Sequence, residues 1–272
     1  MKIGLALNLN KASSISLARE LAQKIRNYGV SVWTEAENKD GSRPWPADVI
    51  MVLGGDGTIL RAAREYAPQG VPLLGINLGK VGFLAELEVD EFDAHFERLL
   101  AGDYQLEERL MLQVDVHRSG TTINSHLVLN DAVIRTGTAR VVELEVTVDE
   151  YYYGNCRGDG VICASPTGST GYSLAAGGPV LLPVLDNMVL TPICPFSPTM
   201  RPLVVEANRS ICISLPGPRT AILTLDGQKE VSLVPGDVVE VTGAAARTRL
   251  VKFKSAFSSD RGSSMLSRRG LK

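Results

Sequence analysis

The first hundred residues alternate short apolar runs with segments in which apolar residues recur at helical spacing. This pattern predicts strands over residues 2–9, 30–33, 48–53 and 72–76, and helices over residues 14–28, 59–67 and 91–100. Strands that alternate with helices are typical of a parallel sheet covered on both faces. Ligands of such sheets bind beyond the carboxyl ends of the strands, so we look for chemistry there.

The pattern changes near Tyr104, where helical spacing stops. Short runs rich in β-branched residues follow, separated by Gly, Pro, Asn or Asp, and they predict strands over residues 114–117, 124–136, 141–148, 161–164, 210–215, 220–225 and 238–242. We therefore predict a Rossmann-like α/β domain over residues 1–104 and a mainly antiparallel β domain over residues 105–253. Residues 254–272 are rich in Ser, Arg, Lys and Gly, and we expect a flexible basic tail.

A glycine-rich segment follows the predicted strand 48–53 and consists of Gly54, Gly55, Asp56, Gly57 and Thr58. Glycines let a phosphate approach the backbone closely, and the helix expected next would direct its N-terminus at the same anion. A carboxylate among phosphates must orient a hydroxyl, accept a proton or hold a metal. The alternative is a strand-to-helix turn in which Asp56 only caps the helix.

A second loop, NLGKVGFL at residues 77–84, also follows a predicted strand. Its position at a carboxyl end favours a functional role, with Phe83 lining the site. A glycine-rich turn with Phe83 in the core is an equally good interpretation.

The β region contains a third candidate, DGVICASPTGSTGY at residues 159–172. Its hydroxyls and glycine amides can bind polar ligands, and Tyr172 offers a ring on which a base could stack. Upstream, Asn130 and Asp131 place an amide beside a carboxylate, which suits an adenine edge and ribose hydroxyls. The alternatives are a hydroxyl-rich surface loop and, for Asn130 and Asp131, a bulge or hairpin turn.

Together these motifs resemble the NAD kinases. The resemblance runs from about residue 1 to about residue 253 and rests on GGDGT, NLGKVGFL, LNDAVI, DGVICASPTGSTGYSLAAGGP and SPTMRPLVV in this order. It implies a two-domain fold with the site between the domains and across subunits of a homodimer or homotetramer. It also implies transfer of a phosphoryl group from ATP, or from polyphosphate, to the adenosine 2′-hydroxyl of NAD, which gives NADP.

The resemblance assigns roles to individual residues. Asp56 would contact the 2′-hydroxyl as the catalytic base or orienting group, and we favour orientation because phosphoryl transfer needs little from a base. Gly54, Gly55, Gly57 and Thr58 would form the phosphate loop. The residues that would contact NAD are Asp56, Gly57, Phe83, Asn130, Asp131, Arg157, Asp159, Thr167, Thr170, Gly171, Tyr172 and Ala175.

Some positions depart from the usual family pattern. Gly171 stands where Ala is usual, Asp131 where Glu is usual, and Ala175 where Ser is frequent. Residues 257–272 also lack the family's C-terminal pattern. None of these changes removes the reaction, although the shorter Asp131 would weaken a ribose contact.

Composition argues against two classes of partner, nucleic acids and membranes. The net charge of −2 and a pI near 6.0 give no basic footprint for nucleic acid, and no apolar run is long enough for a membrane span. Cys156, Cys163, Cys194 and Cys212 lack metal or disulfide spacing, so we expect reduced thiols and a cytoplasmic protein. No protein-built metal site is expected; a divalent ion such as Mg²⁺ would arrive with ATP.

Three other functions share parts of these motifs. Diacylglycerol and sphingosine kinases share the GGDG element, and phosphofructokinases have a similar one, but neither explains the cluster at residues 159–172. A sensor that binds NADP without turnover would use the same adenosine contacts, and Asp56 is the residue that separates it from a kinase.

Overall fold

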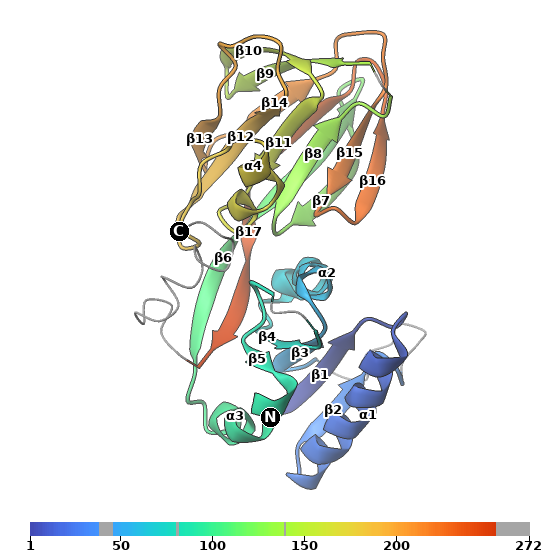
Figure 1. The fold of residues 1–272 in the computed structure, drawn as a ribbon, viewed down its shortest axis with the longest axis vertical. Helices are drawn as coiled ribbons and strands as arrows, with labels where there is room; N and C mark the ends of the chain where they lie inside the picture. Colours follow the sequence, from blue (N-terminus) through green and yellow to red (C-terminus); the bar gives the residue numbers. More distant parts are fainter. Residues whose placement is uncertain (38–45, 80–81, 139, 254–272) are drawn as a thin grey trace. The chain divides into compact units, whose positions relative to one another are not determined.

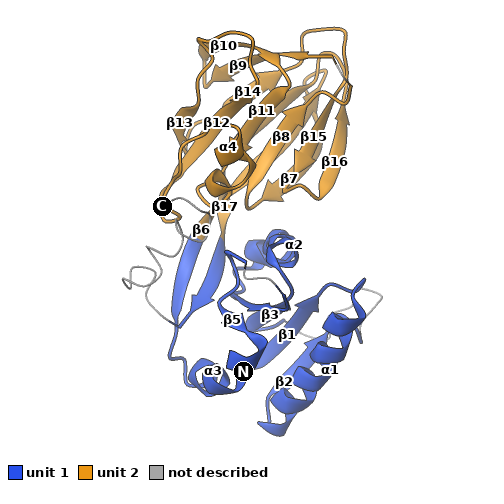
Figure 2. Ribbon diagram, viewed as in Figure 1, with its two compact units in different colours: residues 1–108, 248–272 blue, residues 109–247 orange. Residues whose placement is uncertain are grey.

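The computed structural model describes residues 1–37, 46–79, 82–138 and 140–253, so the predicted tail at 254–272 lies outside the described residues. The chain divides into two compact units, shown in Figure 2. Unit 1 comprises Met1–Glu108 and the stretch that begins at Thr248, whereas unit 2 comprises Arg109–Arg247. The prediction placed all of residues 105–253 in one domain; in the structure the chain returns to unit 1 at Thr248.

Unit 1 is built on a parallel sheet, as predicted, in the order β4-β3-β1-β2. Its α-helices and strands, labelled in Figure 1, are β1 (Lys2–Leu7), α1 (Ala12–Asn27), β2 (Ser31–Thr34), β3 (Val49–Leu53), α2 (Asp56–Tyr66), β4 (Leu73–Asn77), β5 (Leu87–Glu88) and α3 (Phe92–Leu100). Two short 3₁₀ helices, η1 (Ala67–Gln69) and η2 (Val89–Glu91), complete the unit. The chain leaves β1 for β2 on one side and returns to β3 on the other. The carboxyl ends of β1 and β3 therefore form a topological switch point, where ligands of such sheets bind.

Helices cover both faces of this sheet. Apolar residues of α1 and α3 share one buried cluster with Met51 and Leu53 of β3. On the opposite face, Ile59 of α2 lies against Gly75, where an added Cβ would come within 2.7 Å of the Ile59 side chain. Alternate residues of each strand are thus buried against different layers.

Unit 2 is a mainly antiparallel β structure, as predicted. Its strands and short helices are β7 (Thr121–Val128), β8 (Asp131–Arg135), β9 (Val142–Val148), β10 (Tyr151–Gly158), β11 (Gly160–Ala164), η3 (Gly168–Thr170), α4 (Tyr172–Ala175), β12 (Asn187–Ile193), β13 (Leu203–Glu206), β14 (Ile211–Ser214), β15 (Ala221–Leu225) and β16 (Lys229–Leu233). One sheet has the order β13-β12-β11-β8-β15-β16 with every pair antiparallel. A second antiparallel set has the order β10-β9-β14-β17, where β17 is the long strand Val238–Lys252, and apolar residues of both sheets form one core cluster in unit 2.

Two long strands, β6 (Gln105–Arg118) and β17 (Val238–Lys252), contain the boundaries between the units. Residues Val238–Val241 of β17 pair with β14 in unit 2, whereas Leu250 pairs with Leu73 of β4 in unit 1. The sequence pattern predicted only residues 238–242 of this strand, because Gly243 and the small residues after it interrupt the apolar pattern.

Several other predictions of local structure were wrong. The helix expected at 59–67 begins at Asp56, so the second half of the glycine-rich segment is its first turn. The strand expected at 124–136 is two strands, with Leu129 and Asn130 between them. Strands β10, β12, β13 and β16 were not predicted at all.

Candidate active site

Asp56 is held in place by the backbone of the loop that follows β4. Its carboxylate accepts hydrogen bonds from the N–H of Phe83, at 3.1 Å to Oδ1 and 3.0 Å to Oδ2, and from the N–H of Leu84 at 3.0 Å. Asp56 is the first residue of α2 and is partly exposed. The side chain therefore has a fixed direction while part of it still faces solvent, which suits a group that orients a substrate.

Two glycines around Asp56 leave no room for a side chain. An added Cβ at Gly82 would lie 2.4 Å from Oδ1 of Asp56, and one at Gly54 would lie 2.3 Å from Oγ1 of Thr58. Gly55 and Gly57 are exposed, and nothing lies within 4 Å of an added Cβ at Gly55. The open glycines thus lie at the N-terminus of α2, an 11-residue helix whose dipole favours an anion there.

A charged network anchors α2 to the sheet. Arg61 donates to both carboxylate oxygens of Glu35, at 3.0 and 2.7 Å, and to the backbone oxygen of Leu7 at 3.1 Å. Glu35 in turn accepts the N–H of Leu7 at 2.9 Å. A bidentate pair that also holds the end of β1 fixes the start of α2 at the switch point. Neither residue was predicted from the sequence, because the two are far apart in the chain.

In unit 2 the structure brings the Asn130–Asp131 motif together with the hydroxyl-rich loop. Ser165 donates its N–H to the oxygen of Asn130 at 2.8 Å and its Oγ to the oxygen of Leu129 at 2.5 Å. An added Cβ at Gly168 would lie 2.1 Å from the oxygen of Asn130, so the two backbones touch. This contact follows from the pairing of β8 with β11, in which Asp131 lies opposite Ala164.

Gly171 of that loop lies close to Asp131, and the threonines of the loop make hydrogen bonds of their own. Thr170 donates its hydroxyl to the oxygen of Thr167 at 3.3 Å, and the hydroxyl of Thr167 accepts a hydrogen bond from buried Arg109 at 3.3 Å. An added Cβ at Gly171 would lie 4.0 Å from Oδ2 of Asp131. Tyr172 and Ala175 follow on α4 and are exposed, Tyr172 by 45%. The structure thus gathers six of the predicted NAD contacts within unit 2: Asn130, Asp131, Thr167, Thr170, Gly171 and Tyr172.

Asp131 is a buried carboxyl group with a second carboxylate nearby. Burial, and to a smaller extent the charge of Asp226, raises the pKa of Asp131 to about 7. Asp226 lies in the turn after β15 and accepts backbone hydrogen bonds from residues 129–131. Asp226 was not predicted from the sequence, where its one local signal is an Asp-Gly pair between two strands, typical of a tight turn.

Arg157 and Asp159 lie elsewhere in unit 2. Asp159 directly precedes β11, and Gly160 pairs with Arg135, whereas Asp131 pairs with Ala164 at the other end of the same two strands. These ends are about 13 Å apart at roughly 3.3 Å per residue. Arg157 is exposed, and its guanidinium lies 5.6 Å from the ring centre of Phe196. Within one copy of unit 2, these two residues are not part of the Asp131 cluster.

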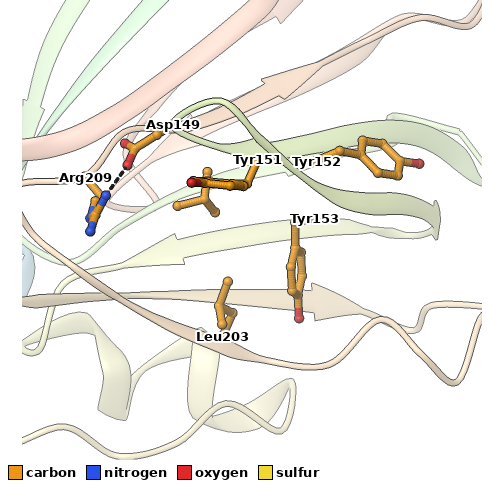
Figure 3. Close-up of a pocket in the computed structure, with 7 residues that line it drawn as sticks. Asp149, Tyr151, Tyr152, Tyr153, Leu203 and Arg209 are labelled. Atoms are coloured by element: carbon orange, nitrogen blue, oxygen red, sulfur yellow. Dashed lines mark hydrogen bonds and ion pairs between the residues drawn. The ribbon is translucent and has the colours of Figure 1, made fainter.

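The pocket drawn in Figure 3 holds none of the predicted residues, whereas a smaller pocket of about 170 Å³ is lined by Arg157. Figure 3 shows a pocket of about 310 Å³ lined by Val148, Asp149, Tyr151, Tyr152, Tyr153, Leu203 and Arg209. In the part of the chain that the structure describes, no three His, Cys, Asp or Glu side chains are grouped to hold a metal. The four cysteines are free, and no helix among the described residues is long and apolar enough to cross a membrane.

Comparison with known proteins identifies the family. Residues 43–104 match the ATP-NAD kinase N-terminal domain and residues 129–253 match the ATP-NAD kinase C-terminal domain. The chain belongs to the NAD kinase family. The matched ranges include the Asp56 segment and the Asp131 cluster, and the chain is therefore an enzyme of the kinase class.

Similar proteins span nearly the whole chain. The NAD kinase of Citrifermentans bemidjiense is 41% identical over 270 residues, which cover 93% of this chain and 94% of that protein. The NAD kinase of Geotalea daltonii is 41% identical with the same coverage. Among solved structures, an Archaeoglobus fulgidus NAD kinase in complex with ATP aligns over all of both chains, with a TM-score of 0.76 and 26% identity. A yeast NADH kinase complexed with NADH shares the fold, with a TM-score of 0.87 over 98% of this chain and 87% of that one, at 24% identity.

Proposed function

We propose that this NAD kinase transfers the γ-phosphoryl group of ATP to the 2′-hydroxyl of the adenosine ribose of NAD and releases NADP. The observation that carries the proposal is the Asp56 carboxylate, fixed by three backbone hydrogen bonds beside exposed glycines at a helix N-terminus. Phosphoryl transfer depends mostly on positioning of the reactants and on charge neutralisation, and the fixed Asp56 carboxylate provides the positioning.

In the proposed reaction Asp56 accepts a hydrogen bond from the 2′-hydroxyl of NAD. This bond orients the hydroxyl oxygen toward the γ-phosphorus of ATP. The phosphates of ATP lie against Gly54, Gly55, Gly57 and Thr58, where glycine backbone can approach an anion closely. The oxygen–phosphorus bond to NAD forms as the bond to the ADP leaving group breaks, and the hydroxyl proton leaves through Asp56 or water. Phe83, partly exposed beside Asp56, lines the site.

Magnesium enters as part of the substrate. The described residues offer no cluster of metal ligands, and the Asp56 oxygens already accept backbone hydrogen bonds. These residues fit an ion that is bound mainly by the phosphates of ATP and by water, as is usual for Mg²⁺ in kinases. The ion supplies charge neutralisation when it is bound, whereas the chain supplies orientation.

We assign recognition of the adenosine to the Asp131 cluster. The amide of Asn130 and the hydroxyls of Thr167 and Thr170 can hydrogen-bond an adenine edge, and an ionised Asp131 can accept from ribose hydroxyls. Tyr172 offers a ring for stacking, and Gly171 and Ala175 leave space around it. Support comes from the proximity of these groups in unit 2.

We further propose that Arg157 and Asp159 contact the dinucleotide held by a second copy, in a homodimer or homotetramer. Asp159 lies five residues, or about 16 Å at roughly 3.3 Å per residue, from Ala164, the strand partner of Asp131, and this separation supports the arrangement. Mixing an Asp56→Asn protein with an Asp159→Ala protein tests it, since mixed oligomers should regain part of the activity that each lacks. Mixtures no more active than the sum of the separate proteins would contradict a shared site.

The reaction itself is tested by NADP formation with NAD, Mg²⁺ and either ATP or polyphosphate. Asp56→Asn keeps one acceptor oxygen for the Phe83 and Leu84 amides, so the fold should survive while turnover falls by about 10²–10⁴-fold. The control is Asp93→Asn, because Asp93 is an exposed carboxylate of unit 1 that pairs with Lys24. Retained NAD binding without product from the unaltered protein would favour a dinucleotide sensor. We expect the enzyme to act in the cytoplasm, in keeping with its free cysteines.

A further inference from the structure

Asp226 lies in a tight turn whose geometry does not require a charged residue. Asp226 and Gly227 have φ values of 50° and 64°, and the N–H of Gln228 donates to the oxygen of Leu225 at 2.9 Å. Positive φ at both central residues is the geometry of a type I′ turn, in which Asn-Gly is at least as favourable as Asp-Gly. The turn between β15 and β16 would therefore form equally well with a neutral amide at position 226.

The Asp226 carboxylate instead binds the chain that enters β8. Oδ1 accepts the N–H of Asn130 at 2.7 Å and of Asp131 at 3.3 Å, and Oδ2 accepts the N–H of Leu129 at 3.2 Å. In return, the N–H of Asp226 donates to the oxygen of Asp131 at 2.9 Å. Three consecutive amides thus converge on one carboxylate that is only 6% exposed. Such a set of bonds fixes the direction of the segment that carries Asn130 and Asp131.

The same contact places two carboxyl groups close together. Asp131 is 7% exposed, and burial together with the Asp226 charge raises its pKa to about 7. The other elements packed around it contribute hydroxyls that do not titrate, from Ser165 at the end of β11 and from Thr167 and Thr170 in the following loop.

Two cations of unit 2 contact groups other than Asp131. Arg109 of β6 donates to Thr167, and Lys229 of β16 lies 3.5 Å from Nδ1 of His126. Of the charged groups on the described elements around Asp131, Asp226 is the one whose charge acts on it.

We infer that Asp226 is a positioning residue of the dinucleotide site: its carboxylate orients residues 130–131 and sets a like charge beside the Asp131 carboxyl group, so that NAD binds more tightly as the pH rises through neutrality. This inference rests on the proposed role of Asp131 toward NAD. An ionised Asp131 accepts a hydrogen bond from a ribose hydroxyl other than the 2′-hydroxyl that Asp56 holds, whereas the protonated form loses acceptor capacity.

The expected size of the effect follows from the titration. A group that is half-ionised near pH 7 is about one-tenth ionised at pH 6 and about nine-tenths ionised at pH 8. The dissociation constant of NAD should therefore be up to about tenfold higher at pH 6 than at pH 8. Equilibrium binding of NAD without ATP is the right readout, because the phosphates of ATP titrate in the same range and those of NAD do not.

The decisive variant is Asp226→Asn. Asparagine suits the turn and keeps the acceptor for Asn130 and Asp131, but it removes the charge beside Asp131. We expect the pH dependence of NAD binding to move to lower pH, with several-fold tighter binding than the unaltered protein at pH 6 and little change at pH 8. The matched control is Asp149→Asn: Asp149, drawn in Figure 3, also has a positive φ of 51° and accepts the N–H of Ser210 at 2.9 Å, so its replacement should leave the profile unchanged.

A second variant keeps the inference testable if Asp226→Asn does not fold. Asp131→Asn should flatten the dependence of NAD binding between pH 6 and pH 8. An unaltered protein whose NAD affinity is flat over this range, an Asp226→Asn protein with the original profile, or an Asp131→Asn protein that keeps the transition would each overturn the inference. Failure of the full chain to make NADP at any pH would instead refute the proposed function, so the two failures are distinguishable.

Discussion

Gly82 and Asp56 meet so closely that an added Cβ on the glycine would lie 2.4 Å from Oδ1 of the carboxylate. In Gly82→Ala, the least costly relief is a movement of the Asp56 side chain, since the alternative is to shift backbone. We expect kcat to fall about 10²-fold with little loss of stability, because a displacement near 1 Å can cost that much in rate.

Gly79→Ala serves as the comparison for that variant. Gly79 lies in the same loop, but no described residue apart from its chain neighbours lies within 4 Å of its added Cβ. Its kcat should therefore fall much less than that of Gly82→Ala, as measured by NADP formation at saturating substrates. Equal losses in both variants would show that the loop, and not the contact with Asp56, controls turnover.

Gly168 and Gly171 should respond differently to the same substitution. A Cβ at Gly168 would lie 2.1 Å from a backbone oxygen of Asn130, whereas a Cβ at Gly171 would lie 3.1 Å from the oxygen of Gly168. Gly168→Ala must push the short helix η3 away from the segment that enters β8, and we expect a loss of roughly 2 kcal/mol or more in unfolding free energy. Gly171→Ala should fold normally and bind NAD within a few-fold of the unaltered protein. Urea unfolding and NAD binding measure the two effects, and comparable destabilisation by both would contradict the packing argument.

Asp131 should make stability depend on pH. Burial raises its pKa to about 7 in the folded protein, while its pKa in the unfolded chain is ordinary, near 3.9. Between these values the folded state holds a proton that the unfolded state has lost, so stability falls as the pH rises through this window. The full penalty, on the order of 4 kcal/mol for a shift of about three units, is present above pH 7.

Asp131→Asn removes that penalty. We expect its thermal midpoint to exceed that of the unaltered protein at pH 8 and to match it at pH 4. Asp149 is the opposite case, since its pKa is lowered by the amide of Ser210 and by Arg209, so Asp149→Asn should bring no gain at pH 8. A gain for Asp131→Asn that is equal at both pH values would refute the ionisation argument.

The two acidic partners of β17 should differ in their effect on stability. Glu86 is buried, accepts Nζ of Lys252 at 3.1 Å and accepts the N–H of Phe253 at 3.1 Å. Glu86→Ala leaves a buried cation and should cost about 3–5 kcal/mol, whereas Glu108→Ala removes an exposed pair with Arg249 and should cost less than about 1 kcal/mol. Urea denaturation followed by circular dichroism compares them. A similar midpoint for both variants would show that the buried pair adds no more than the exposed one.

The sequence predicted the elements that are buried on regular faces and missed strands at sheet edges. β10, β13 and β16 each lie at the end of a sheet order, so solvent reaches one side and their apolar alternation is weak. β12 is central to its sheet but contains Pro192, a residue that argues against such a strand. The helix that begins at Asp56 was predicted to begin at residue 59, because the glycines before that residue are typical of a loop.

The candidate site was predictable where its residues are neighbours in the chain. Local composition indicates Asp56 with its glycines and Asn130 with Asp131. It does not indicate Asp226, because the carboxylate of Asp226 binds amides about 95 residues earlier in the chain, and only the pairing of β15 with β8 brings these groups together. Glu86, whose partners lie 166 and 167 residues later, was missed for the same reason.

The course of β17 has a consequence for biosynthesis. Unit 1 is discontinuous: Leu250 pairs with Leu73 of β4, and Val251 and Phe253 belong to the core cluster that contains Ile3 and Leu5. During translation, the part of unit 1 that begins at Thr248 is therefore made only after all of unit 2 has been made. β5 pairs with the carboxyl end of β4, but until β17 is made the start of β4 at Leu73 remains an open hydrogen-bonding edge, where newly made chains are exposed to mispairing. Completion of the kinase is thus tied to arrival of the final strand.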